Sequence, residues 1–243
     1  PYSILNVHGD YAPEKAVDIV ILPDGYSEEE MGKFVIDCNF FKECLFSYEP
    51  YKSYQDRFNI RAVMAPSQDS GISIPAEDIW KNTVVGCSFY TFDSERYCMS
   101  TNNQAIRNLA GLVPYDQIYI LANTSKYGGG GIYNFYCVSS TDDNLASDVI
   151  IHEFGHGLHG MLSKCRFKSL AGTNVSRDFV ELPSQIMENW CRHPEVMKMY
   201  AKHYETGEAI PDEIIKKIEN AGTYGQGFVN AELIAASLLD FKY

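Results

Sequence analysis

The segment Val149–Leu162 constrains the fold more than any other part of the chain, because it places a His-Glu-x-x-His motif inside an apolar helical pattern. Positions i and i+4 share one face of an α-helix, so His152 and His156 can direct both imidazoles at one metal ion. Glu153 lies about 100° further round the helix, where its carboxylate can reach a metal-bound water. The motif therefore predicts a catalytic zinc site in which Glu153 is the general base for the attack of water on a carbonyl.

The surroundings of the motif decide between this prediction and a chance match on an ordinary helix with two packed histidines. Three apolar residues precede the motif, and no Asp, Glu, Lys or Arg lies between Glu153 and Lys164. Such an uncharged setting is typical of a buried helix, whereas a surface helix carries charges on one side. We therefore favour the metal site.

Composition excludes several kinds of partner. The 243 residues include 32 acidic and 20 basic side chains, a net charge of −12, so neither nucleic acid nor an anionic membrane surface is expected as a partner. No uncharged run reaches the roughly 18 residues of a membrane-spanning helix, so no membrane span is predicted. The seven cysteines include no Cys-x-x-Cys pair, so they indicate neither a disulfide framework nor a compartment.

Alternating strand and helix patterns precede the motif. Three short apolar runs predict buried strands, at Val17–Leu22, Phe58–Met64 and Gln117–Ala122. A capping box of Ser27 and Glu30 begins a helix that continues at helical spacing to Leu45, and Asn103–Leu112 predicts a second helix. This order predicts an α/β layer with a mostly parallel sheet.

Four consecutive glycines, Gly128–Gly131, are followed by an aromatic segment that alternates like an edge strand. A phosphate-binding loop is disfavoured, because neither Lys-Ser/Thr nor a helix start follows. An exposed sheet edge offers main-chain hydrogen bonds to a peptide of any sequence. We therefore expect substrate binding along Gly130–Phe135, with an ordinary hairpin as the alternative. The candidate residues are Gly130, Gly131, Ile132 and Tyr133.

Residues from about 17 to 156 resemble the IgA-peptidase-like family of zinc metallopeptidases. The segments that carry this resemblance are Asp18-Ile-Val-Ile-Leu-Pro-Asp-Gly-Tyr26, Asp69-Ser-Gly71 with Ile74-Pro75, Trp80-Lys-Asn-Thr83, Ser88-Phe-Tyr-Thr-Phe92, Arg96-Tyr97 and Tyr127–Tyr136. In that family the metal helix is followed by Leu-x-Asp-Glu-Tyr, which this chain lacks.

Residues from about 152 to 241 resemble a second family, the thimet-oligopeptidase and dipeptidyl-carboxypeptidase group. The matching segments are Gly157–Ser163, Ser169–Trp190, Tyr200–Tyr204, Gly225–Phe228 and Ala235–Asp240. The two resemblances meet at the shared His-Glu-Phe-Gly-His, so we interpret the sequence as a chimera of two zinc-peptidase families.

The second resemblance implies the third zinc ligand. In that group the ligand is a glutamate in a Val-Glu-x-Pro-Ser-Gln setting, and Glu181 occupies this place. A catalytic zinc site needs three protein ligands and one open position. The alternative for Glu181 is a surface carboxylate, although a glutamate among apolar residues is unfavourable unless it is paired or metal-bound. One Zn²⁺ bound by His152, His156 and Glu181 is therefore expected.

Three other residues near the motif receive weaker assignments. His159 shares the metal-facing side of the helix, and we interpret it as a packing or supporting residue rather than a ligand. Glu188 lies seven residues after Glu181 and is a candidate to orient a zinc-bound imidazole through its free N–H. Asp148 is another candidate to support the site, and a helix N-terminal charge is the favoured interpretation.

The expected fold is zincin-like, α/β plus all-α, with a mixed sheet, a metal-binding helix and a helical C-terminal part. Residues 1–162 form the expected α/β subdomain with the edge strand and the motif helix, and residues 163–243 the helical subdomain with the third ligand. Within the latter, helices are expected from Pro194 to near Gly207, over Pro211–Asn220 and over Phe228–Phe241.

The expected function is zinc-dependent hydrolysis of peptide bonds in a peptide or protein substrate. In the oligopeptidase group, a histidine and tyrosines further towards the C-terminus than Tyr243 stabilise the oxyanion, so zinc binding is expected to survive better than turnover. Tyr133, Tyr136 and Tyr224 are candidates to replace those donors. The alternatives are a weakly active or inactive zinc-stabilised peptide-binding domain, and a zinc hydrolase of non-peptide amides or esters. The first family is typically exported and the second often cytoplasmic, and we favour export.

Overall fold

The computed structural model describes residues 2–48, 51–132, 135–143, 146–166, 175–191, 193–201, 203 and 206–225, and the separate positions 227–228, 230–231, 234–235 and 238. The chain forms two compact units, Pro1–Trp190 and Cys191–Tyr243. His152, His156 and Glu181 all belong to the first unit. The functional division after Leu162 stays a prediction.

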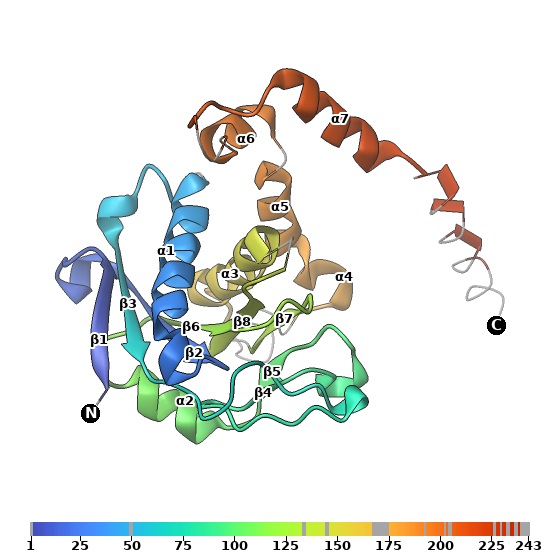
Figure 1. Ribbon diagram of the computed structural model, residues 1–243. Helices are drawn as coiled ribbons and strands as arrows, with labels where there is room; N and C mark the ends of the chain where they lie inside the picture. The colour runs from blue at the N-terminus through green and yellow to red at the C-terminus, as the bar shows by residue number, and fades with distance from the viewer. Residues whose placement is uncertain are drawn as a thin grey trace. The chain divides into compact units, whose positions relative to one another are not determined.

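The first unit contains all the strands of the described residues and the helices α1 to α5 (Figure 1). The strands are β1 Ser3–His8, β2 Val17–Asp24, β3 Phe58–Met64, β4 Cys87–Ser88, β5 Met99–Ser100, β6 Gln117–Ala122, β7 Gly129–Ile132 and β8 Tyr136–Ser140. The helices are α1 Met31–Ser47, α2 Asn103–Ala110, α3 Ala146–Leu162, α4 Arg177–Val180 and α5 Leu182–Cys191.

A six-stranded sheet in the order β1-β3-β2-β6-β8-β7 forms the centre of this unit. The pairs β2–β3, β2–β6 and β6–β8 are parallel, and the antiparallel strands β1 and β7 form the two edges. The predicted mostly parallel sheet is thus confirmed, and β3 and β6 have the predicted bounds. The sequence pattern did not predict β1, because this edge strand is largely exposed and lacks a clear apolar alternation.

Helices cover both faces of the sheet (Figure 1). On one face, Phe41 of α1 packs on Tyr119 of β6 with ring centroids 4.7 Å apart, and α3 contacts β7 and β8. On the other face, Ile106 and Leu109 of α2 join a buried core with the inward side chains of β2, β6 and β8. A sheet covered on both faces explains why β6 is buried along its whole length.

The predicted start of the first helix is confirmed. The capping box of Ser27 and Glu30 is present, with the Ser27 N–H donating to the Glu30 carboxylate at 2.9 Å. It closes a short 3-10 turn that leads directly into α1. The second helix, α2, ends at Ala110, two residues before its predicted end, because Gly111 is its C-terminal cap.

The second unit contains α6, Pro194–Tyr200, and α7, Asp212–Thr223. The predicted extension of the first of these helices to near Gly207 is wrong. Ala201 is extended and its carbonyl accepts a hydrogen bond from the Ile210 N–H, so the chain turns back instead of continuing the helix. In the predicted final helix, Phe228–Phe241, the described positions are helical and the others lie outside the described residues.

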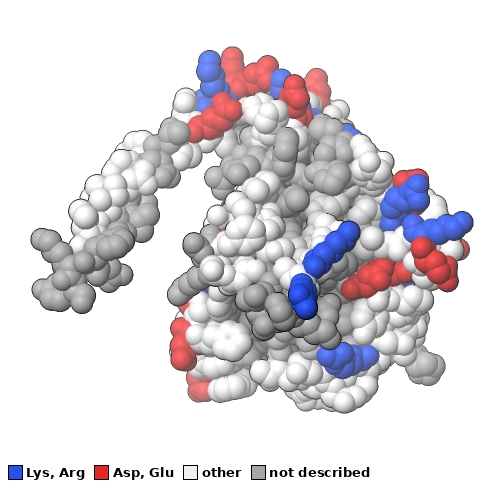
Figure 2. Space-filling view, turned by 180° about the vertical axis from the view of Figure 1, so that it is seen from behind, with Lys and Arg blue, Asp and Glu red and all other residues white. Residues whose placement is uncertain are grey.

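Among the described residues, no helix combines the length and apolar character needed to cross a membrane. On the face shown in Figure 2, Lys and Arg side chains lie in separate small groups, several of them near Asp or Glu.

Candidate metal centre and active site

Helix α3 carries the His-Glu-x-x-His motif and is held on the sheet by its buried side. Val149, Ile150, Ile151 and Phe154 are buried. Polar contacts add to this packing, because the Tyr119 hydroxyl donates to the Ile150 carbonyl at 3.3 Å and the Cys137 thiol to the Glu153 carbonyl at 3.1 Å. The motif residues therefore project from a helix whose position two strands determine.

Gly157, directly after the motif, allows α3 to approach the sheet closely. A Cβ atom at this position would lie 3.0 Å from the Oε1 of Gln117. The Gln117 amide is itself buried and donates to the Ile118 carbonyl at 3.0 Å. A larger residue at position 157 would therefore separate helix and strand.

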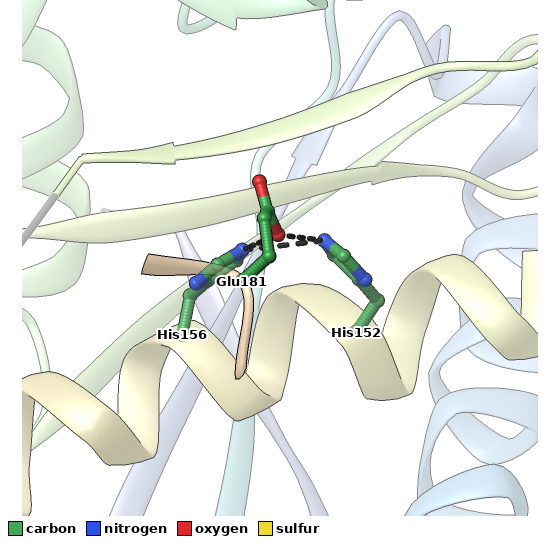
Figure 3. Close-up of side chains that lie close together, drawn as sticks. All are labelled: His152, His156 and Glu181. Atoms are coloured by element: carbon green, nitrogen blue, oxygen red, sulfur yellow. Dashed lines mark hydrogen bonds and ion pairs between the residues drawn. The ribbon is translucent and has the colours of Figure 1, made fainter. Parts of the chain in front are cut away.

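His152, His156 and Glu181 converge on one point (Figure 3). The Nε2 atoms of the two histidines are 3.2 Å apart, and the Oε2 of Glu181 lies 3.3 Å from Nε2 of His152 and 3.1 Å from Nε2 of His156. The two imidazoles come from α3, and the carboxylate comes from the separate segment between α4 and α5. Among the described residues, this is the group of three side chains that can hold a metal ion.

The spacing of these three atoms fits a zinc ion. Zinc binds imidazole nitrogen and carboxylate oxygen at about 2.0–2.2 Å, and the edges of a tetrahedron of that size are about 3.3–3.6 Å. The observed separations of 3.1–3.3 Å are close to these edges. Two imidazoles and one carboxylate leave the fourth position of such a tetrahedron open.

Glu181 reaches this point because two short helices meet at it. It is the C-terminal cap of α4, and α5 begins at the next residue, with Pro183 in the first turn where a proline needs no N–H partner. The Ser184 hydroxyl is fully buried, and its proton is shared between the main-chain carbonyl of Glu181 at 2.9 Å and Oε2 of the same residue at 3.0 Å. Ser184 therefore orients the same oxygen atom that faces the histidines.

Glu153 lies beside this group in a nearly closed environment, with 9% of its surface exposed. Burial raises the pKa of its carboxyl to about 8, the negative charge of Glu181 adds to the rise, and the positive charge of Arg96 partly offsets it. Its oxygens face the edge strand β7, since added Cβ atoms at Gly129 and Gly131 would lie 3.5 Å and 3.4 Å from them. The carboxylate thus lies between the metal-facing side of α3 and β7.

The histidines of α3 differ in their surroundings. Burial lowers the pKa of His156, although the Glu181 carboxylate partly offsets this effect, so the metal-free imidazole is neutral near pH 7. The Nδ1 atoms of His156 and His159 are buried without a hydrogen-bond partner among the described residues. His159 lies outside the three-residue group and its ring packs against Phe179, with centroids 6.0 Å apart.

Two carboxylates, Asp148 and Glu188, are candidates to support the site, and the structure describes the side-chain position of only the first. Asp148 lies in the first turn of α3, the position expected for a helix N-terminal charge. The side chain of Glu188 lies outside what the structure describes, so its proposed contact with an imidazole stays a prediction.

The predicted substrate edge is an edge strand. Gly130, Gly131 and Ile132 belong to β7, which pairs with β8 along one side and is bridged on its other side only at Gly129, by Tyr97, among the described residues. Gly130 is buried, whereas Gly131 and Ile132 are exposed. Tyr133 lies outside the described residues. The role of this edge in substrate binding stays a prediction.

Tyr136 is unsuitable as an oxyanion donor. Its side chain is fully buried, and its hydroxyl donates to the Ser100 carbonyl at 2.6 Å and accepts from the Ser100 N–H at 3.0 Å. The ring belongs to the core on the α2 side of the sheet, opposite α3. The expectation that Tyr136 could replace an oxyanion donor is wrong because neighbouring residues of a strand point to opposite faces of the sheet, and Tyr136 points away from α3.

Arg96 lies close to the site, although the sequence alone did not indicate this position. The resemblance includes Arg96-Tyr97, but no spacing relates it to the motif. In the structure, the Arg96 carbonyl accepts a hydrogen bond from Gly129 N–H at 3.1 Å, which brings this arginine to the start of β7. Only the tertiary pairing of two distant segments reveals this position.

Two family comparisons overlap on the site. The chain matches IgA Peptidase M64 over residues 5–190 and Peptidase family M3 over residues 141–243. The shared stretch, residues 141–190, contains α3 and Glu181. The predicted joining of two metallopeptidase families at the motif helix is therefore confirmed.

Individual relatives match the C-terminal part. A dipeptidyl carboxypeptidase of Escherichia coli (strain K12) is 50% identical over 101 residues, which cover 41% of this chain and 15% of that protein. An organellar oligopeptidase A of Arabidopsis thaliana is 43% identical over 96 residues, covering 39% of this chain and 12% of that protein. The chain thus spans less than a fifth of the length of these relatives. Because the first family match extends over most of its residues, the chain belongs to the IgA Peptidase M64 family of metallopeptidases.

Proposed function

We propose that this chain is a zinc-dependent peptidase with a zincin-like site. The observation that carries the proposal is the convergence of His152, His156 and Glu181, whose ligand atoms lie 3.1–3.3 Å apart. A zinc ion bound by these residues supplies a Lewis acid that polarises a carbonyl and makes water more acidic. Both family matches are to peptidase families, which supports peptide bonds as the substrate.

Glu153 is the proposed general base, which takes a proton from the attacking water at its carboxylate. It is next to His152 in sequence but lies outside the three-residue group, so its oxygens stay available for proton transfer. Burial raises its pKa in the metal-free chain, and a bound cation would lower that pKa again toward the ionised carboxylate that a base requires. Its burial excludes bulk water from the proton-transfer path.

The proposed substrate position is the outer edge of β7. This strand lies beside Glu153, and its exposed positions are Gly131 and Ile132. Because Gly131 has no side chain, nothing at this position separates the strand edge from the Glu153 carboxylate. An extended peptide would add as a further strand through main-chain hydrogen bonds. In this proposal residues 1–162 supply the edge, the base and two ligands, and residues 163–243 supply Glu181.

A joint measurement of metal and activity tests the proposal. Metal content and hydrolysis of a quenched-fluorescent peptide library are measured on the unsubstituted chain and on Glu153→Gln. We expect one zinc per chain in both proteins and hydrolysis in the unsubstituted chain only. Zinc in both proteins with hydrolysis by neither would contradict the peptidase and favour a zinc-stabilised peptide-binding domain. Absence of zinc from both would contradict the metal site.

A further inference from the structure

The segment Arg96–Cys98 closes one end of the β7 edge. It runs parallel to β7 and pairs at Gly129, whose N–H donates to the Arg96 carbonyl at 3.1 Å and whose carbonyl accepts from the Cys98 N–H at 3.2 Å. The chain then leaves the edge, because both main-chain groups of Ser100 bond to the Tyr136 hydroxyl on the α2 side of the sheet. The outer edge is therefore occupied at Gly129.

Gly131 is the first open position after this closed end. Main-chain groups alternate in direction along a strand, so those of Gly131 point outward as those of Gly129 do. No described residue pairs with them, and Gly131 is exposed whereas Gly129 is buried. Two residues of strand separate the two glycines by about 7 Å. A peptide that pairs with Gly131 therefore meets the Arg96–Cys98 segment within about two residues.

Arg96 brings a positive charge to this closed end. Its side chain is exposed, and its charge acts on Glu153. The neighbouring carboxylate of Glu95 is bound to Lys126 at 2.9 Å and so does not neutralise the arginine. The guanidinium carbon lies 5.8 Å from the ring centroid of Tyr97, and no ion pair of Arg96 with another described side chain is present. A guanidinium in this state is suited to a carboxylate ligand, which it can bind through two parallel hydrogen bonds.

The loop that leads to Arg96 is held in a defined conformation. Tyr90, Phe92 and Asp93 all have positive φ angles, of 62°, 56° and 58°, which are unfavourable for residues with side chains. Lys126 ties this loop to the preceding one through Glu95 and, at 3.7 Å, Glu77. Backbone strain that neighbouring contacts maintain is frequent at ligand-binding loops.

The charge decides which way a peptide lies along the edge. A peptide antiparallel to β7 directs its C-terminal end toward Gly129 and the guanidinium. A parallel peptide directs its N-terminal end there, where an ammonium group would be repelled. The combination of a closed edge and a cation thus selects the antiparallel orientation with a carboxylate at the closed end.

We infer that Arg96 binds the C-terminal carboxylate of a peptide substrate, so the site selects peptides whose chain ends within about two residues of the position paired with Gly131. The inference rests on the proposed peptidase function and on the free edge of β7. It assigns to Arg96 a role in substrate selection, through direct contact with the peptide.

Hydrolysis of matched peptides tests this inference. Three peptides of one sequence are compared: the free acid, the C-terminal amide, and the amide with a glutamate as its last residue. We expect kcat/KM to favour the free acid by roughly 10- to 100-fold, the effect of one charge-assisted contact. In Arg96→Gln this preference disappears through a higher KM for the free acid, and Arg96→Lys restores part of it. Arg57→Gln, an exposed arginine before β3, is the matched control and keeps the preference.

Three outcomes would overturn the inference. Equal rates on acid and amide would exclude a carboxylate site. Equal rates on the acid and the glutamate-containing amide would assign the site to acidic side chains instead of chain ends. An equal fall in kcat/KM for all three peptides in Arg96→Gln, with a shifted pH profile of activity, would mean that Arg96 acts only on the pKa of Glu153.

A binding experiment separates this inference from the proposed function. Fluorescein-labelled free-acid and amide peptides are titrated into Glu153→Gln with and without Arg96→Gln. Tighter binding of the free acid that depends on Arg96 supports the carboxylate site even if the unsubstituted chain hydrolyses no peptide. Hydrolysis by the unsubstituted chain without any such difference in binding would retain the peptidase and reject the carboxylate site.

Discussion

Ser184 shows how a single neutral side chain can determine the geometry of the metal centre. Its buried hydroxyl lies 3.0 Å from the Glu181 oxygen that faces both histidines. Without this contact the carboxylate can rotate, because Glu181 is partly exposed and lies at the junction of two short helices. Residues that orient metal ligands typically contribute 10- to 100-fold to metal affinity.

Ser184→Ala is therefore expected to weaken zinc binding by about 10-fold without unfolding the chain. The zinc dissociation constant is measured by competition with a chelator. Ser3→Ala, an exposed position in β1, serves as the control and leaves the affinity unchanged. Equal affinities of Ser184→Ala and the unsubstituted chain would show that Glu181 needs no such support.

Glu153 gives the metal-free chain a specific pH dependence. Its folded-state pKa of about 8 lies above the ordinary value of 4.5, so the folded chain retains a proton that the unfolded chain has released. The stabilisation is complete below about pH 4.5 and is lost as the pH rises through about 8. Between these values it decreases by up to about 1.4 kcal/mol per pH unit.

The metal-free Glu153→Gln variant lacks this proton and is expected to lose less stability between pH 5 and pH 8. The free energy of unfolding in urea, measured for both proteins across this range, gives the difference. Parallel pH profiles of the two proteins would mean that the Glu153 carboxyl titrates normally in the folded state.

At the scale of elements, Asp24 connects the end of β2 to the segment before β5. This carboxylate is fully buried and accepts from the N–H groups of Val85 at 2.9 Å and Cys87 at 2.7 Å, and from the Thr83 hydroxyl at 2.9 Å. Burial raises its pKa, and these hydrogen bonds partly offset the rise. The contacts position the chain that returns through β5 to the β7 edge.

Asp24→Ala leaves two buried N–H groups without an acceptor and is expected to lower the free energy of unfolding by about 2–4 kcal/mol. Chemical denaturation measures the change. The control is Asp10→Ala, which removes an ion pair between an exposed carboxylate and Arg61 and is expected to change stability by less than about 1 kcal/mol. A change in Asp24→Ala as small as in the control would contradict this account of the element.

The edge strand is the second element on which the site depends. A Cβ at Gly131 would lie 3.4 Å from the Glu153 carboxylate. The two methyl groups of a valine would extend beyond this contact, so Gly131→Val is expected to lower kcat/KM by roughly 10- to 100-fold by crowding the base, while zinc content stays at one per chain. Gly32→Val in α1, where an added Cβ meets no atom within 4 Å, is the control. Full activity of Gly131→Val would contradict catalysis beside this edge.

Regular elements with strong local patterns could be predicted from the sequence. The buried strands β3 and β6 and the capping box before α1 follow from apolar runs, prolines and side-chain spacing. Edge strand β1 and the turn after Ala201 could not be predicted, because their structure depends on partners distant in the chain. The i, i+4 spacing of His152 and His156 is local, whereas Glu181 was identified through a family resemblance. The position of Arg96 depends on pairing with Gly129, which no local pattern shows.

In the whole molecule, one family match contains the entire proposed site and the second match overlaps it. Residues 5–190 match IgA Peptidase M64 and residues 141–243 match Peptidase family M3, and the motif helix belongs to both. The sheet, with its edge strand, precedes the shared stretch, and Glu181 lies within it. The first unit, Pro1–Trp190, thus contains the base, the edge and all three proposed ligands.

Zinc K-edge X-ray absorption of the purified chain, with zinc counted per chain on the same sample, measures the proposed metal centre itself. We expect one zinc per chain, with nitrogen and oxygen neighbours at about 2.0–2.2 Å, two of them with the scattering pattern of imidazole. In Glu181→Ala we expect the zinc either to lose one protein oxygen from its neighbours or to be released. A chain that binds no zinc, or a spectrum with sulfur neighbours at about 2.3 Å, would contradict a centre formed by His152, His156 and Glu181.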